Sequence, residues 1–149
     1  MHIEKITEVT EEVFDVVRRL VPLLGDHKPK PSRDDLNRLV DSGASVLLVA
    51  RYPDESSSIA GMLTIAFYRV PTGGRSIVED LVVAEEYRGM GIAKALLQSA
   101  IDLARAAGAN GVALTSHPGR VAANQLYIRM GFKKRETNAY IFPLDQLQE

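Results

Sequence analysis

The chain has 149 residues, of which 46% are hydrophobic and 25% charged, and its formal net charge is -1. These values fit a single domain over residues 1–149 and give no global basic field that would indicate nucleic-acid binding. Cysteine is absent, which excludes disulfides, thiolate nucleophiles and thiolate metal sites. No apolar run is long enough to cross a bilayer and the first residues show no signal-peptide core, so we expect a cytoplasmic protein without a membrane partner.

The N-terminal part predicts one strand followed by two short helices. Residues 2–6 alternate weakly between apolar and polar side chains. Thr10 is a good cap for a helix whose apolar residues recur at helical spacing until Gly25 ends it. After a proline-broken loop, Ser32 can cap a second helix that ends near Ser42. Two helices placed before the main sheet would cover one end of a binding cleft.

Three strands and a long helix are predicted next. Residues 45–51 form an unbroken apolar run, which is typical of a strand buried on both faces. Residues 59–70 follow a polar turn and form a hairpin with that strand. Residues 76–83 form the third strand of this meander. The helix over residues 90–107 presents a broad apolar face that is suited to packing on a sheet.

The C-terminal part predicts a strand, a helix and a last hairpin. Residues 112–115 form a short strand, and the strand–helix–strand order implies a parallel pair joined by a right-handed crossover. Residues 121–130 form a fourth helix, which Gly131 closes. Residues 132–135 and 139–144 form the final hairpin. The chain is therefore α+β in its opening hairpins and α/β around the stretch that joins the meander to the long helix.

That joining stretch carries glycines at a helix start. Arg88, Gly89 and Gly91 lie where the helix begins. A helix start exposes backbone N–H groups without intrahelical partners, and its macrodipole adds partial positive charge. Glycine also lets a ligand come close to the backbone, so the stretch predicts an anion site, most often for a phosphate. The spacing lacks the third glycine of a dinucleotide fingerprint and the Gly-Lys-Ser/Thr end of a P-loop.

Two motifs, in order, resemble a known family. Residues 88–93, Arg-Gly-Met-Gly-Ile-Ala, match the Arg/Gln-x-x-Gly-x-Gly/Ala loop of the GNAT superfamily of acetyl-CoA-dependent N-acetyltransferases. Residues 124–132 are similar to the family's second cofactor motif, Asn-x-x-Tyr followed by Gly-Phe. The preceding residues 81–83 resemble its fourth strand. The resemblance covers nearly the whole chain and is weakest before Ser45, where the family varies most.

The resemblance implies a GNAT-like α+β (α/β three-layer) fold. It implies a mixed, mostly antiparallel twisted sheet of six to seven strands, splayed between strands 4 and 5, with about four helices. Acetyl-CoA (coenzyme A) is the implied acyl-donor cosubstrate, and no metal is implied. The fourth strand would pair with the pantetheine arm, and the loop N–H groups would hold the pyrophosphate. The cofactor-binding residues implied are Leu81, Val82, Val83, Arg88, Gly89, Met90, Gly91, Ile92, Ala93, Lys94, Asn124 and Tyr127.

The resemblance also implies an acyltransferase in which an amine attacks the thioester directly in a ternary complex. Tyr127 is the implied general acid for the CoA thiolate. Its amphipathic side chain also suits a half-buried core position, but the neighbouring motif residues favour the functional role. Glu79 is the candidate general base, and its alternation with Asp80 predicts that only one of the two faces the cleft. His117 either touches a ligand or is an inert loop histidine. The acceptor, a small molecule or a protein amine, is unknown, and a homodimer is suggested by family analogy alone.

Two other functions stay open from the sequence. A non-catalytic acyl-CoA-binding regulatory domain would keep the affinity for the cofactor but transfer no acetyl group. A nucleotide-binding domain would be stabilised against unfolding by ATP and not by CoA. Asn124 and Tyr127 lie on one helix face at a spacing of three residues, so both can meet the same ligand, which favours the transferase.

Overall fold

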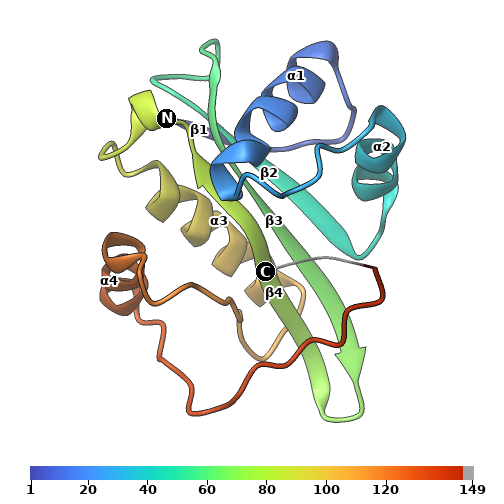
Figure 1. Ribbon diagram of the computed structural model, residues 1–149, viewed down its shortest axis with the longest axis vertical. Helices are drawn as coiled ribbons and strands as arrows, with labels where there is room; N and C mark the ends of the chain where they lie inside the picture. The colour runs from blue at the N-terminus through green and yellow to red at the C-terminus, as the bar shows by residue number, and fades with distance from the viewer. Residues whose placement is uncertain (146–149) are drawn as a thin grey trace. The chain divides into compact units, whose positions relative to one another are not determined.

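The computed structural model describes residues 1–145, which fall into two compact units, residues 1–114 and the segment from Thr115 onward. The second unit contains α4 (Val121–Met130). The elements of the first unit (Figure 1) are, in chain order, β1 (His2–Lys5), α1 (Glu11–Leu20), the 3₁₀ segment η1 (Val21–Leu24), α2 (Arg33–Asp41), β2 (Ser45–Arg51), β3 (Ile59–Val70), β4 (Gly73–Val83), the 3₁₀ segment η2 (Glu85–Tyr87) and α3 (Ile92–Ala106).

The first unit is built on an antiparallel sheet in the order β1-β2-β3-β4. Helices α1 and α2 cover one face of this sheet and α3 packs on the other (Figure 1). The unit has three layers because the central strands bury apolar side chains on both faces, as the run in β2 predicts. The core on the α1 and α2 side includes Val13, Val17, Leu20, Leu36, Leu47, Met62 and Val82.

Most predicted element boundaries are confirmed. The predicted ranges of β2, β3 and α4 agree with the structure to the residue. The hydroxyl of Thr10 accepts a hydrogen bond from the Val13 N–H at 3.2 Å and caps α1. Ser32 caps α2, where it forms a reciprocal capping box with Asp35. These caps are local features, so the sequence alone is sufficient to place them.

The predicted strand at residues 112–115 is reduced to isolated bridges. Ala113 forms a parallel bridge with Ile77 of β4, and a second parallel bridge joins Ala109 to Gly74. The parallel direction agrees with the prediction, but the segment is too short to add a strand. The splay between strands 4 and 5 therefore remains a prediction.

The predicted final hairpin is wrong. No residue between 132 and 145 is in a strand, so the described residues hold a four-stranded sheet and not one of six to seven strands. Three consecutive cations at residues 133–135 break the period-two alternation of the first arm. Pro143 in the second arm has no backbone N–H to donate to a ladder.

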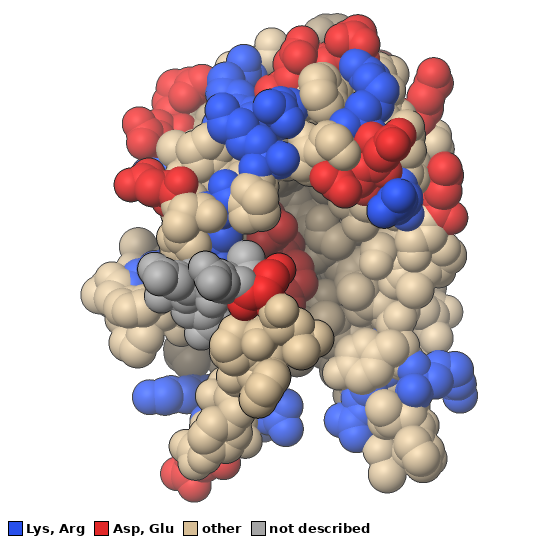
Figure 2. Space-filling model, turned by 45° about the vertical axis from the view of Figure 1, so that its right-hand side comes forward, with Lys and Arg blue, Asp and Glu red and all other residues tan. Residues whose placement is uncertain are grey.

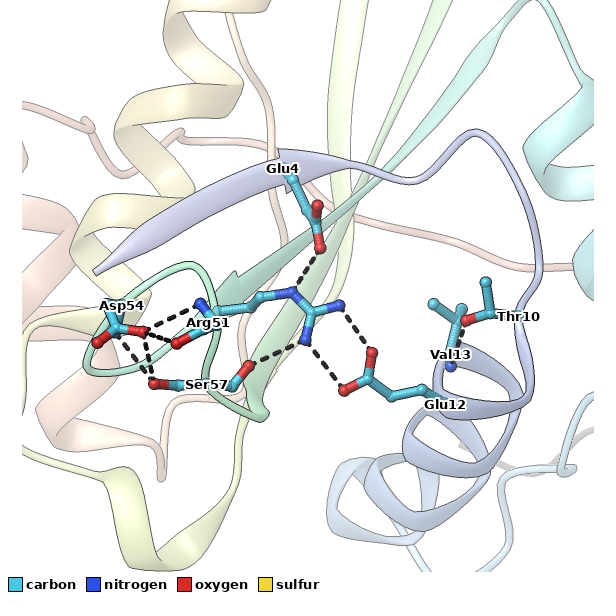
Figure 3. A network of polar contacts seen from close by, with 8 residues as sticks. Glu4, Thr10, Glu12, Val13, Arg51, Asp54 and Ser57 are labelled. Carbon is cyan, nitrogen blue, oxygen red and sulfur yellow. Dashed lines mark hydrogen bonds and ion pairs between the residues drawn. The ribbon is translucent and has the colours of Figure 1, made fainter.

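Arg51, at the end of β2, ties together β1, α1 and the turn after β2 (Figure 3). Its Nε donates to Glu4 at 2.7 Å, and its two terminal nitrogens donate to both carboxylate oxygens of Glu12 at 3.0 and 2.7 Å. One of these nitrogens also donates to the carbonyl oxygen of Ser57 at 2.9 Å. The hydrogen bonds between the Arg51 guanidinium and the Glu12 carboxylate raise the pKa of Arg51 and lower the pKa of Glu12.

Replacing Arg51 by Met should lower the free energy of unfolding by about 2 kcal/mol at neutral pH, because hydrogen bonds to charged groups contribute on that order. A lowered carboxyl pKa gives stability that is present above the unfolded pKa and is lost as the pH falls. The difference between wild type and variant should therefore shrink between about pH 5 and pH 3, as urea unfolding can measure. Arg105→Met is the control, because Arg105 is 76% exposed and lies 3.6 Å from Asp102. Equal losses in the two variants would argue against a structural role for Arg51.

Candidate functional site

Strand β4 carries a bulge at the predicted general base. Thr64 of β3 lies opposite Glu79, but Met62 lies opposite Val82, so two residues of β4 oppose a single residue of β3 between these pairs. Asp80 lies in the bulge with a φ of 51°, a left-handed value that Asp tolerates better than most residues. Bulges and backbone outliers of this kind are common next to active sites.

The bulge alters the expectation for the two neighbouring carboxylates. Strict alternation would place Glu79 and Asp80 on opposite faces, but the extra residue breaks the alternation here and both residues are exposed. Although the residue is exposed, the surrounding protein removes part of the water around the Glu79 carboxyl group and so raises its pKa. The Asp80 carboxylate raises the pKa further, and Lys28 opposes both effects. A carboxyl group with a raised pKa is better matched to proton transfer near neutral pH than an ordinary one.

Beyond the bulge, one edge of β4 is open within the first unit. Before the bulge, Ser76 and Val78 exchange backbone hydrogen bonds with Ala113, at 3.0 and 2.8 Å. Between Glu79 and Val83, no backbone hydrogen bond joins this edge to another part of residues 1–114, while β3 pairs with the opposite edge. The backbone of Leu81 to Val83 can therefore pair with an extended ligand, as an added strand would.

The glycine loop presents a row of free N–H groups at the start of α3. Gly89 and Gly91 have φ values of 82° and 79°, which glycine adopts at no steric cost. The first helical hydrogen bond runs from the Ala95 N–H to the Gly91 carbonyl, at 3.1 Å. No N–H group from Gly89 to Lys94 has an acceptor among residues 1–145, and no atom lies within 4 Å of a Cβ built on either glycine. Open donors at a helix start are the groups from which anion sites are built.

Contacts from the neighbouring strands hold this loop. The rings of Tyr52 and Tyr87 meet edge to face with centroids 6.0 Å apart, and the Tyr52 hydroxyl lies 3.7 Å from the sulfur of Met90. A Cβ on Gly61 of β3 would lie 3.0 Å from the Val82 carbonyl oxygen and 3.3 Å from Cγ2 of Ile92, so glycine lets β3 lie close to β4 and to the start of α3. Sequence motifs miss Tyr52 and Gly61, because the fold alone brings them to the loop.

The two cations predicted to assist the loop are available for an anion. Arg88 and Lys94 are both exposed. Neither forms an ion pair within residues 1–145. Their charges therefore add to the field of the helix start without competition from a carboxylate.

In the second unit, α4 carries the other predicted cofactor residues. The amide nitrogen of Asn124 donates to the His117 carbonyl oxygen at 3.0 Å. Tyr127 is 6% exposed, and its ring meets that of Phe132 edge to face with centroids 5.9 Å apart. The Tyr127 hydroxyl makes no hydrogen bond within the part of the chain that the structure describes. An unpaired hydroxyl at the end of a largely buried tyrosine ring has capacity for a ligand.

His117 is engaged by its own loop. Its Nδ1 accepts a hydrogen bond from the Gly119 N–H at 2.9 Å, and its carbonyl oxygen accepts the one from Asn124. A Cβ on Gly119 would lie 3.0 Å from that same ring nitrogen. These contacts shape the turn that leads into α4, which favours the structural alternative for this histidine.

Residues 1–145 show neither a metal cluster nor a membrane span. No three His, Asp or Glu side chains of this part of the chain gather closely enough to hold a metal ion. None of its helices combines the length and the apolar character needed to cross a bilayer.

The amino-acid sequence has relatives among characterised proteins. N-acetyltransferase 8B and N-acetyltransferase 8F1 of Rattus norvegicus are each 31% identical to it over 83 residues, or 54% of this chain. The matched region is 37% of the first relative and 38% of the second, so the chain spans well under half the length of either.

Solved structures share the fold across nearly the whole chain. An aminoglycoside acetyltransferase from an uncultured soil metagenomic sample, in complex with trehalose, is 18% identical with a TM-score of 0.83 and covers 97% of this chain and 96% of its own. A probable acetyltransferase is 24% identical with a TM-score of 0.82 and coverages of 99% and 100%. A transcriptional regulator from Bacillus halodurans C-125 is 23% identical with a TM-score of 0.77 and coverages of 95% and 99%.

A family model described as "Acetyltransferase (GNAT) family" matches residues 10–132. That range contains β4 with its bulge, the glycine loop and the α4 residues described above. The fold likeness and the family match agree with the two sequence motifs. This chain belongs to the acetyltransferase (GNAT) family.

Proposed function

We propose that the chain is an N-acetyltransferase that moves an acetyl group from acetyl-CoA to an amine acceptor by direct attack in a ternary complex. The observation that carries this proposal is the row of unpartnered N–H groups from Gly89 to Lys94, which follows directly on the open edge of β4. Family membership supports acetyl transfer in general, and both named relatives are N-acetyltransferases.

Each part of coenzyme A would be bound by a different group of residues. The free N–H groups of the loop would bind the pyrophosphate, and Arg88 and Lys94 would add charge-assisted contacts. The open backbone of Leu81 to Val83 would pair with the amides of the pantetheine arm. Asn124 and Tyr127 would contact the cofactor from α4, since they share one face of that helix.

Acyl transfer to an amine requires a neutral amine, a stabilised oxyanion and a protonated leaving group. Glu79 would take the proton from the ammonium, directly or through water. The amine nitrogen would then bond to the thioester carbonyl carbon, with the developing oxyanion held by a backbone N–H near Val82 or Val83. As the carbon–sulfur bond breaks, the Tyr127 hydroxyl would protonate the thiolate. The attacking nitrogen would lose its second proton, which would restore the Tyr127 hydroxyl through water. The chain has no cysteine to carry a thioester intermediate.

Replacing Glu79 by Gln should lower kcat/KM about a hundredfold, because a positioned general base contributes on that order. In the wild type, kcat/KM should rise with pH as Glu79 loses its proton, and the raised pKa moves this rise to higher pH than for an ordinary glutamate. Profiles of kcat/KM against pH for both proteins measure the effect. Glu86→Gln, in the exposed η2 segment, is the matched control and should keep the wild-type profile. If the Glu79→Gln variant also kept it, the base would be another group.

The cofactor itself is tested by titration calorimetry and thermal unfolding. Acetyl-CoA should bind and raise the melting temperature, since a ligand at about 100 times its Kd adds about 2.7 kcal/mol to the stability of the folded state. ATP should give no comparable protection. Absence of CoA binding at millimolar concentration would overturn the proposal. If acetyl-CoA binds, a screen of amines, amino acids and peptides that follows thiol release would identify the acceptor.

A further inference from the structure

A cavity within the first unit lies between the two N-terminal helices and the sheet. Its volume is about 290 Å³, close to the lower end, about 300 Å³, of pockets that bind small ligands. It is bounded by η1, α2 and the central strands, so it lies on the face of the sheet opposite α3. The apolar side chains in its wall include Val17, Val21, Leu24, Leu39, Leu47 and Met62. A wall of this kind favours a ligand with an apolar body.

Three charged residues, Lys28, Asp35 and Asp80, also line the cavity. The Asp35 carboxylate already accepts the Ser32 N–H at 2.9 Å as part of the α2 capping box. Lys28 lies close enough to the Glu79 carboxylate to act on its protonation. Asp80 makes no hydrogen bond and no ion pair within residues 1–145. Of the two cavity carboxylates, Asp80 is therefore the one with both oxygens open to a cation, since one oxygen of Asp35 is used in the capping box.

The bulge places Asp80 beside the proposed base. Asp80 and Thr64 both line the cavity, and Thr64 is the cross-strand partner of Glu79. Directly opposed residues of an antiparallel pair share a face of the sheet, so Glu79 lies on the face that holds the cavity and is the chain neighbour of Asp80, which lines it. Around α1 and α2, in the upper half of Figure 2, basic and acidic side chains are interspersed. The cation preference therefore comes from Asp80 and not from a general acidic surface.

We propose that the acceptor is a small primary amine with an apolar body, held with its ammonium on Asp80 and its body between η1 and α2. This inference rests on the acetyl transfer proposed above. The ammonium would lie next to Glu79, which is where deprotonation must occur. A polyamine is a poor fit, because its second cation would meet an apolar wall and the like charge of Lys28, with only the Asp35 carboxylate of the capping box to pair with. An uncharged analogue would leave the Asp80 carboxylate unpaired.

The test is titration calorimetry of the full chain without acetyl-CoA, with 2-phenylethylamine as the probe. Spermidine and 2-phenylethanol serve as the polycationic and uncharged comparisons. Asp80→Asn keeps the side-chain shape and the tolerance of a positive φ but removes the charge, and it should weaken binding of the probe about tenfold. Asp15→Asn, the same change at an exposed position of α1, should leave binding unchanged. Leu39→Phe narrows the cavity without adding charge and should also weaken binding.

The outcomes separate this inference from the proposed function. Binding of 2-phenylethylamine that depends on Asp80 would support the cavity as the amine site. If acetyl-CoA then yielded no product, only the proposed acetyl transfer would be overturned. Equal affinity of the wild type and Asp80→Asn for the probe would overturn the assignment of the cavity as the amine site. So would tighter binding of spermidine or of 2-phenylethanol than of 2-phenylethylamine. Acetylation of some other amine would leave the transferase standing in those cases.

Discussion

Gly91→Ala is expected to weaken acetyl-CoA binding about tenfold or more. Gly91 caps α3 with a φ of 79° and has open space where a Cβ would stand. This left-handed backbone costs a residue with a Cβ about 1–2 kcal/mol, and relaxing it would turn the free N–H groups away from a common point. The new methyl group would also occupy the space through which a phosphate approaches. Titration calorimetry with acetyl-CoA measures the loss.

Gly108 provides a matched control at the other end of the same helix. It has a φ of 75° and also has no atom within 4 Å of a built Cβ. Gly108→Ala should therefore cost a similar amount of stability in thermal unfolding but leave the affinity for acetyl-CoA unchanged. If both variants lost affinity equally, the effect would come from general destabilisation, and the assignment of the loop as the pyrophosphate site would fail.

Tyr127→Phe is expected to lower kcat by about a hundredfold or more, because a general acid in proton transfer contributes about 10²–10⁴-fold. Phenylalanine keeps the ring that meets Phe132 at 5.9 Å between centroids, so the packing of α4 is retained. The Kd for acetyl-CoA should change little, since only the hydroxyl is lost. Steady-state kinetics with an identified acceptor, together with calorimetry, separates the two effects.

Tyr140→Phe removes the same hydroxyl from a tyrosine that is 89% exposed, and it should have wild-type kcat. An unchanged kcat in Tyr127→Phe would show that Tyr127 has only a structural role in the core, which is the alternative that its amphipathic side chain allows. A loss of melting temperature without a loss of kcat would point the same way. A loss of kcat with intact cofactor affinity would argue against a non-catalytic acyl-CoA-binding domain.

Local sequence signals predicted much of the fold. The caps at Thr10 and Ser32, the apolar run of β2 and the glycine start of α3 each depend on neighbouring residues only, and the structure confirms each of them. The candidate site followed from two motifs that resemble a family. The final hairpin was predicted both from the residues and from that resemblance, and it failed where residues 133–135 and Pro143 oppose strand formation.

The parts that sequence could not predict depend on contacts between distant segments. The bulge at Asp80 is a property of how β4 pairs with β3, so alternation along β4 alone could not reveal it. The cavity wall combines residues from helices and strands that are far apart in the chain. Arg51 likewise finds Glu4 and Glu12 only once β1 and α1 are in place.

The most direct test of the acetyltransferase assignment follows thiol release and acetylated amine in the same reaction. The protein is incubated with acetyl-CoA and a panel of amines, and the masses of the product and of the intact protein are measured by mass spectrometry. Direct transfer predicts one N-acetylated amine for each thiol released and no acetyl group retained on the protein. Binding of acetyl-CoA without thiol release above the buffer rate for every amine, or an acetyl group retained on the protein, would contradict the account.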